Sequence, residues 1–241
     1  MRILITNDDG VYAPQLLPLI KWVQKLGDVM TVVPKVEQSG KSHGIEIHKA
    51  FEAKKVELEP GIVVWAVDST PADCVRFAIL GLKEHFDLVI SGVNRGLNVG
   101  KDIMYSGTVS AVCEAAALGV KAVAFSTEPE SYHEATAHLD RVWDFMTEHH
   151  LLEKHEIYNV NIPRQAGPIR ITHQGGPYYS DDFEPIGSDM YLPKGKPVFT
   201  PSDTFALDTD AVLRGGYISI MPLSMERADM DVYRALIHLN P

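Results

Sequence analysis

Short apolar runs that alternate with helical patterns constrain the fold of this chain more than any other feature of its sequence. Over residues 1–130 the runs are continuously apolar instead of alternating with polar residues. Such runs are typical of parallel strands that are covered on both faces. Strands are therefore predicted at Ile3–Thr6, Val29–Val33, Ile62–Val67, Leu88–Ile90 and Ala122–Phe125.

Helical patterns fill the segments between these runs. Pro14 and Pro71 stand where the first turn of a helix tolerates proline, and Gly27 and Gly119 stand where helices end. Strands that alternate with helices predict an α/β fold built on a doubly wound, mostly parallel sheet. The helices are predicted at Pro14–Leu26, Pro71–Leu82, Thr108–Leu118 and Ser131–Glu148.

The sequence changes in character after about residue 150. Loops rich in Gly, Pro, Asp and Tyr take over, and Gly175–Pro201 has little periodicity. A long irregular segment in a compact protein is usually functional or used in assembly. We therefore expect a core at residues 1–165 and a loop-rich extension at residues 166–241 that serves oligomerisation. Beyond residue 150 strands are predicted at Ile157–Ile162, Ile169–Thr172 and Tyr217–Met221, and a terminal helix at Met225–Leu239.

Composition narrows the classes of partner. The 241 residues carry a net charge of −10 with no block of Lys or Arg, which argues against nucleic acid. A small anionic substrate remains compatible, because a bound cation reverses the local field. Cys74 and Cys113 lack the spacing of metal ligands, so buried free thiols are expected. With no apolar segment long enough to span a bilayer and no signal peptide, we expect a cytoplasmic protein without a membrane partner.

The first predicted strand ends abruptly in Asn7-Asp8-Asp9-Gly10. In open α/β sheets, ligands bind at the carboxyl ends of the strands. Two adjacent carboxylates there repel each other and need a counter-charge, and Mg²⁺ or Mn²⁺ supplies one because these cations prefer oxygen ligands. The motif therefore indicates a metal site. The alternative is ordinary turn chemistry, in which Asn and Asp close a turn before a helix.

Two further polar loops follow predicted strands, at residues 34–42 and 91–100. The ends of parallel strands lie at one edge of a sheet, so the loops can converge on the acidic turn. Ser39 offers a hydroxyl and Asn94 a carbonyl oxygen, which with Asp8 and Asp9 makes four oxygens around a hard cation. Taken alone, Ser39 and Asn94 are ordinary hydrogen-bonding loop residues.

Ser106, Gly107 and Thr108 open a predicted helix after the third loop. N–H groups at a helix N-terminus, with nearby hydroxyls, make an anion site. The commoner use of such residues is to cap an ordinary helix. A metal that faces a phosphate cradle is what hydrolysis of a phosphomonoester needs, because the cation neutralises phosphoryl oxygens.

Other phosphate and metal motifs do not fit. Ser39-Gly40-Lys41-Ser42 lacks the earlier glycine of a nucleotide-binding phosphate loop. Asp8 and Asp9 are adjacent, whereas an aspartyl-phosphate mechanism uses Asp-x-Asp spacing. The ten histidines show no convincing metal-ligand spacing.

Motifs that follow one another along most of the chain resemble a known family. They are Ile3–Gly10, Gln38–Ser42, Thr70–Val75, Ser91–Gly100, Tyr105–Val109, Asn159–Pro163, Ile171–Gly175 and Gly216–Ile220. In this order they are similar to the SurE family, the stationary-phase survival proteins, which are metal-dependent 5′-nucleotidases.

The resemblance implies a Rossmann-like catalytic core that hydrolyses nucleoside 5′-monophosphates to nucleoside and inorganic phosphate, with one Mg²⁺ or Mn²⁺ per subunit. It also implies a C-terminal β-hairpin and helix exchanged between the subunits of a homodimer or homotetramer. Asp8 and Asp9 are then the candidate catalytic residues. The implied metal ligands are Asp8, Asp9, Ser39 and Asn94, and the implied phosphate contacts are Ser106, Gly107 and Thr108.

Questions of mechanism and class stay open at this point. Either a metal-associated water or an aspartate attacks phosphorus, and in the first case Asp8 or Asp9 orients the water or takes its proton. A nucleotide-binding regulatory module without turnover would use the same core and anion site without needing paired carboxylates. A sugar-nucleotide transferase is a third possibility, and it would release no inorganic phosphate from a nucleoside monophosphate alone.

Overall fold

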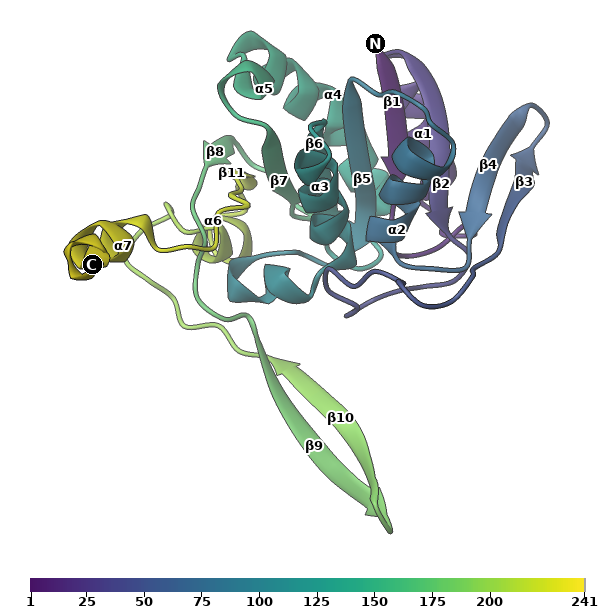
Figure 1. The fold of residues 1–241 in the computed structure, drawn as a ribbon. Coiled ribbons are helices and arrows are strands. Elements are labelled where there is room, and N and C mark those ends of the chain that lie inside the picture. Colours follow the sequence, from purple (N-terminus) through teal and green to yellow (C-terminus); the bar gives the residue numbers. More distant parts are fainter. Residues whose placement is uncertain (241) are drawn as a thin grey trace.

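A nine-stranded sheet organises the structure, a computed structural model that describes residues 1–240 (Figure 1). Its strands are β1 (Arg2–Thr6), β2 (Asp28–Pro34), β3 (Ala53–Glu59), β4 (Ile62–Val67), β5 (Leu88–Arg95), β6 (Lys121–Thr127), β7 (Ile157–Ile162), β8 (Ile169–Ile171) and β11 (Ile218–Pro222). They lie in the order β3-β4-β2-β1-β5-β6-β7-β11-β8. The six strands from β4 to β7 in this order are parallel, whereas β3 and β11 pair antiparallel with β4 and β7. The predicted doubly wound, mostly parallel sheet is confirmed.

Helices cover both faces of the sheet, which explains why its central strands are apolar throughout. The four main helices are α1 (Leu16–Val23), α2 (Pro71–Arg76), α3 (Gly107–Ala117) and α4 (Tyr132–Glu148). Ile3 and Ile5 of β1 join a buried cluster with α1 and α4, whereas Leu4 joins a second cluster with α2 and α3. Successive side chains of a strand point to opposite faces, so each core takes alternate residues.

Local hydrogen bonds explain two helix boundaries that differ from the prediction. The N–H of Leu16 donates to the carbonyl of Ala13 at 3.0 Å, and this turn leaves Pro14 outside α1. α7 (Met230–Leu236) starts later than predicted because the carboxylate of Asp229 caps its first turn. The remaining helical segments are η1 (Phe77–Gly81), which continues α2 as a π-helix, η2 (Gly100–Tyr105), α5 (Leu151–Lys154), α6 (Asp208–Leu213) and η3 (Ile237–Leu239).

A long hairpin extends away from the body of the molecule (Figure 1). Its antiparallel strands are β9 (Tyr179–Gly187) and β10 (Met190–Pro197). Periodicity did not locate these strands because almost every residue of both is exposed, so neither face has a core to be apolar against. Among residues 1–240, no helix is both long enough and apolar enough to cross a membrane.

Candidate active site at the carboxyl edge of the sheet

The turn after β1 presents the two adjacent aspartates. Asn7 is fully buried and closes the turn, since its Nδ2 donates to the carbonyl of Gly10 at 3.0 Å and its Oδ1 accepts the N–H of Gly10 at 3.2 Å. Gly10 has a φ of +92°, and a Cβ there would lie 3.1 Å from the backbone of Val36. The turn chemistry considered as an alternative is therefore real, but it holds Asn7 and Gly10 and leaves the carboxylates of Asp8 and Asp9 free for another use.

Asp8 lies against the amino end of α3. The hydroxyl of Thr108 donates to Asp8 Oδ1 at 2.6 Å, and a Cβ at Gly107 would lie 2.9 Å from the Asp8 side chain. The backbone carbonyl of Asp8 accepts the N–H of Gln38 at 2.7 Å. Burial raises the pKa of Asp8, and the hydrogen bonds from Thr108 only partly oppose this. The acidic turn, the loop after β2 and the start of α3 thus meet at one carboxylate.

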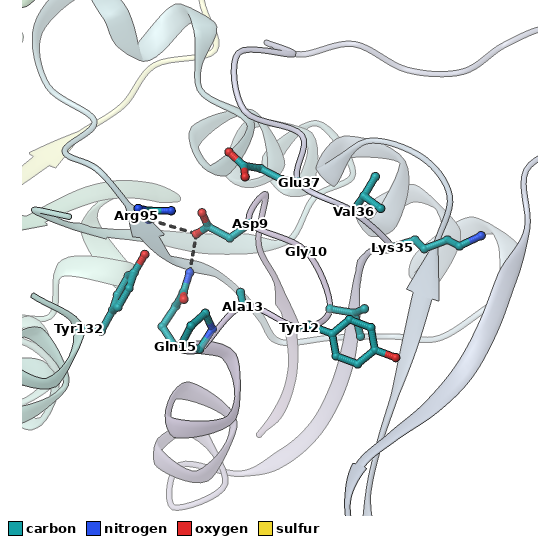
Figure 2. Close-up of a pocket in the computed structure, with 12 residues that line it drawn as sticks. Asp9, Gly10, Tyr12, Ala13, Gln15, Lys35, Val36, Glu37, Arg95 and Tyr132 are labelled. Atoms are coloured by element: carbon teal, nitrogen blue, oxygen red, sulfur yellow. Dashed lines mark hydrogen bonds between the residues drawn. The ribbon is translucent and has the colours of Figure 1, made fainter. Parts of the chain in front are cut away.

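The carboxylate of Asp9 faces Gln15, the residue before α1, and Arg95 (Figure 2). Its Oδ2 accepts two hydrogen bonds, from Gln15 Nε2 at 2.5 Å and from the backbone N–H of Arg95 at 3.1 Å. Burial, and next the negative charge of Asp8, raise the pKa of Asp9 from 3.8 to about 7. Both carboxylates therefore sit where ionisation is unfavourable without a positive charge nearby.

The donor set fits a hard divalent cation. A cation beside Asp8 and Asp9 would offset both the burial and the mutual repulsion that raise the pKa of Asp9. Within residues 1–240 no three His, Cys, Asp or Glu side chains cluster as a metal site. The predicted ligands Ser39 and Asn94 would add a hydroxyl and an amide oxygen to the two carboxylates. Oxygen-only donors favour Mg²⁺ or Mn²⁺ over softer metals.

The two other predicted ligands have different surroundings. Asn94, in β5, is nearly buried, and its Nδ2 donates to the carbonyl of Gly96 at 2.8 Å, which occupies the nitrogen and leaves Oδ1 as its acceptor atom. Ser39 is exposed and its hydroxyl donates to Glu37 at 2.7 Å. The neighbouring Gln38 ties this loop to Asp8, so Ser39 is near the turn through the backbone. Its role as a ligand stays a prediction.

The predicted phosphate residues start α3. The hydroxyl of Ser106 accepts the N–H of Val109 at 3.1 Å and so caps the helix, which is the commoner use considered above. The hydroxyl of Thr108 is engaged by Asp8. Of the first-turn N–H groups, that of Val109 is capped by Ser106 and that of Thr108 is directed at Asp8. The helix dipole gives this end of α3 a partial positive charge. A phosphate role of this turn would therefore rest on the Gly107 N–H and on the dipole more than on the two hydroxyls.

A network of buried asparagines holds the loop that follows Asn94. The carbonyl of Asn98 accepts the Nδ2 groups of Asn159 and Asn161, each at 2.8 Å. Asn161 Oδ1 accepts the N–H of Asn98 at 2.8 Å in return. These hydrogen bonds attach the loop to β7. They explain why the Asn159-Val160-Asn161 motif has an asparagine at both ends.

Sequence reasoning missed the residues on the α1 side of Asp9. A cavity of about 360 Å³ borders this carboxylate (Figure 2), and Gln15, Glu37, Arg95 and Tyr132 are among its lining residues. Burial, with a contribution from the charge of Asp9, raises the pKa of the Tyr132 hydroxyl. Tyr132 begins α4, which packs against α1, and no local pattern connects either helix to the acidic turn.

The fold and the residues at this edge together define the class of protein. The chain is an α/β protein with paired carboxylates after its first strand, placed beside the amino end of a helix on the opposite face from α1.

Comparison with known proteins gives the particular family. The model of the family "Survival protein SurE" matches residues 3–181. A 5′-nucleotidase SurE of Caldanaerobacter subterraneus subsp. tengcongensis is 36% identical, over 97% of this chain and 95% of that protein. A 5′-nucleotidase SurE of Natranaerobius thermophilus is 35% identical, over 98% of this chain and 97% of that protein. The crystal structure of the SurE protein from Aquifex aeolicus superposes with a TM-score of 0.80 at 28% identity, covering 99% of both chains. This chain belongs to the SurE family.

Proposed function

We propose that this chain is a 5′-nucleotidase that hydrolyses nucleoside 5′-monophosphates to nucleosides and inorganic phosphate with a divalent cation. Besides family membership, one observation carries the proposal: the hydrogen bond from Thr108 to Asp8 joins the acidic turn to the amino end of α3. The acidic turn favours a cation, and a helix N-terminus favours an anion. A phosphomonoester bound together with a cation satisfies both.

The proposed cation is one Mg²⁺ or Mn²⁺ per subunit, held by Asp8, Asp9, Ser39 and Asn94. When bound, it supplies neutralisation of phosphoryl oxygens and a lower pKa for a nearby water molecule. Residues of the chain itself are proposed to orient the nucleophile, accept its proton and bind the phosphate.

Each catalytic aspartate has one oxygen free of side-chain hydrogen bonds. Thr108 holds Asp8 Oδ1 and Gln15 holds Asp9 Oδ2, so within residues 1–240 Asp8 Oδ2 and Asp9 Oδ1 accept no such bond. These oxygens are proposed to face the cation and the nucleophile beside it, and Asp8 or Asp9 is proposed to orient that nucleophile or accept its proton. Ser106, Gly107 and Thr108 are proposed to line the phosphate, with the N–H of Gly107 binding it and stabilising negative charge on it.

Phosphate release tests this function. Protein stripped with EDTA is given a panel of nucleoside monophosphates, without metal and then with Mg²⁺ or Mn²⁺. We expect release only with metal, and the panel then ranks the bases. Nucleotide binding without release under any metal would replace the enzyme by a regulatory module. Release that needs a second acceptor substrate would indicate a transferase.

We further propose a homodimer or homotetramer built through the C-terminal part of the chain. The hairpin exposes Phe183, Ile186 and Tyr191, and α7 exposes Val232 and Leu236. Exposed apolar groups gathered on projecting elements are typical of protein interfaces. The proposed division at residue 165 separates the catalytic core from this extension, although β8 and β11 of the extension complete the edge of the core sheet. Size-exclusion chromatography with light scattering measures the mass directly.

A cytoplasmic location is proposed from the cysteines. Cys74 is buried, Cys113 is half-buried, and both are free thiols. Burial raises the pKa of both thiols, which keeps them unreactive. Free thiols are typical of a reducing compartment.

A further inference from the structure

Gln15 contacts the candidate metal site without being any of the ligands that the family resemblance implies. Its Nε2 lies 2.5 Å from Asp9 Oδ2, and the backbone N–H of Arg95 lies 3.1 Å from the same oxygen. Figure 2 shows both hydrogen bonds converging on Asp9. We infer that Gln15 is a positioning residue, which fixes the orientation of the Asp9 carboxylate so that Oδ2 is committed and Oδ1 remains for the divalent cation. The inference rests on the proposed cation site.

The side chain of Gln15 is held in place by burial. It is only 1% exposed, and Leu16 and Leu19 on the inner side of α1 are fully buried in the core. Water therefore does not compete for the hydrogen bond to Asp9, and the start of α1 cannot move without disturbing the packing of that face. A donor fixed in this way fixes its acceptor.

A purely structural role explains Gln15 poorly. It occupies the position before the first residue of α1, yet its side chain makes no capping hydrogen bond to that helix. Its Oε1 is buried and has no hydrogen-bond partner within residues 1–240. A buried acceptor without a partner costs stability. The amide of Gln15 thus holds the carboxylate of Asp9 while its own partnerless oxygen lowers the stability of the fold.

An amide is the side chain that suits this task chemically. Lys or Arg at position 15 would neutralise Asp9 and compete with the cation, and Asp or Glu would add a third negative charge. A neutral donor fixes the carboxylate and leaves its charge available. The same arrangement occurs on Asp8, where the neutral hydroxyl of Thr108 donates to Oδ1. Each aspartate of the pair therefore has one oxygen held by a neutral side-chain donor.

The substitution Gln15→Met tests the inference, since Met has a similar volume and no donor. Binding of Mn²⁺ to EDTA-stripped protein is followed by the electron paramagnetic resonance of free Mn²⁺, which needs no substrate. We expect the Kd for Mn²⁺ to rise about ten- to hundredfold, the usual effect of losing a hydrogen bond to a metal ligand. Thermal unfolding without metal should be unchanged or slightly higher, because the partnerless Oε1 is removed. Phosphate release should recover toward the wild-type rate as Mn²⁺ is raised.

Gln24→Met is the matched control, because Gln24 lies directly after the same helix and is exposed. Its Kd for Mn²⁺ should equal that of the wild type. An unchanged Kd in Gln15→Met would overturn the inference while leaving the cation site intact. A weaker Kd accompanied by a lower melting temperature without metal, and no recovery at high Mn²⁺, would assign Gln15 a structural role instead. Absence of Mn²⁺ binding by the wild type would contradict the proposed function itself.

Discussion

The carboxyl edge of the sheet and the protruding hairpin differ in the kind of side chain they bury and expose. At the edge, buried polar groups are held by hydrogen bonds within the chain, as with Asn7 and Asn98, although the hydroxyls of Thr6 and Ser91 and Gln15 Oε1 have no partner within residues 1–240. In the hairpin, apolar groups such as Phe183 and Tyr191 are exposed and pack against no core of the subunit. The two regions therefore differ in which contacts fix their conformation. The hydrogen bonds of the edge form within one subunit, whereas the apolar side chains of the hairpin are left uncovered by that subunit.

The largest expected effect comes from removing a charge at the edge. Asp8→Asn and Asp9→Asn should each lower phosphate release by at least about a hundredfold, because each removes a proposed cation ligand and a candidate proton acceptor. The variants should fold, as the amide keeps the shape of the carboxylate. Steady-state phosphate release with circular dichroism measures both.

Asp28→Asn is the control for this charge effect, because Asp28 is exposed at the far end of β2 and its ion pair with Arg2 spans 3.8 Å. It should retain wild-type activity. Full activity in Asp9→Asn would remove the catalytic role from the pair. Equal losses in all three variants would point to net charge in place of the site.

Core and hairpin can be compared directly by truncating one buried and one exposed apolar side chain. Ile5→Ala empties part of the cluster between β1 and α1, and should lower the free energy of unfolding by about 2–5 kcal/mol. Phe183→Ser should leave the unfolding of a dissociated subunit within about 0.5 kcal/mol of the wild type. It should instead weaken association. Urea unfolding at low concentration and light scattering give the two readouts, and a stability loss in Phe183→Ser equal to that in Ile5→Ala would show that the hairpin packs on its own subunit.

The pH dependence of stability without metal should also distinguish the edge of the sheet from the rest of the molecule. The pKa of Asp9 is about 7 in the folded chain and near 3.8 when unfolded, so the folded chain binds more protons between about pH 4 and pH 7. The free energy of unfolding contributed by Asp9 therefore falls as pH rises through this window. Asn at position 9 does not ionise. In EDTA, Asp9→Asn should be more stable than the wild type at pH 8, by a few kcal/mol at most because Asp9 is partly exposed.

Urea unfolding of the two proteins at pH 5 and pH 8 checks this prediction, with Asp28→Asn expected to follow the wild type at both values. Saturating Mn²⁺ should reverse the order at pH 8, since binding stabilises only the protein that retains the carboxylate. A pH-independent difference between Asp9→Asn and the wild type would show that Asp9 does not titrate in this window.

The sequence predicted those parts of the structure that follow from short-range pattern and strand direction. Asp8, Asp9 and Asn94 follow apolar runs, and parallel strand ends share an edge, so their shared edge was foreseeable. Gln15 was not, because the direction of its side chain depends on the turn between β1 and α1 and on no periodicity. The hairpin strands and the edge strand β3, with its exposed Lys54 and Lys55, lack a buried face that would give them a pattern.

The smallest expected effect distinguishes the capping role of Ser106 from its proposed phosphate role. Ser106 caps this helix through its hydroxyl, so Ser106→Ala should cost about 1 kcal/mol of stability. Ser106→Asp keeps a side-chain acceptor for the N–H of Val109 and should retain that stability. Its negative charge would repel a phosphate bound at the same turn, so KM for nucleoside monophosphates should rise several-fold at saturating Mn²⁺ while the melting temperature stays near that of the wild type. An unchanged KM in Ser106→Asp would leave Ser106 as a cap alone and would argue against the proposed phosphate site at the start of α3.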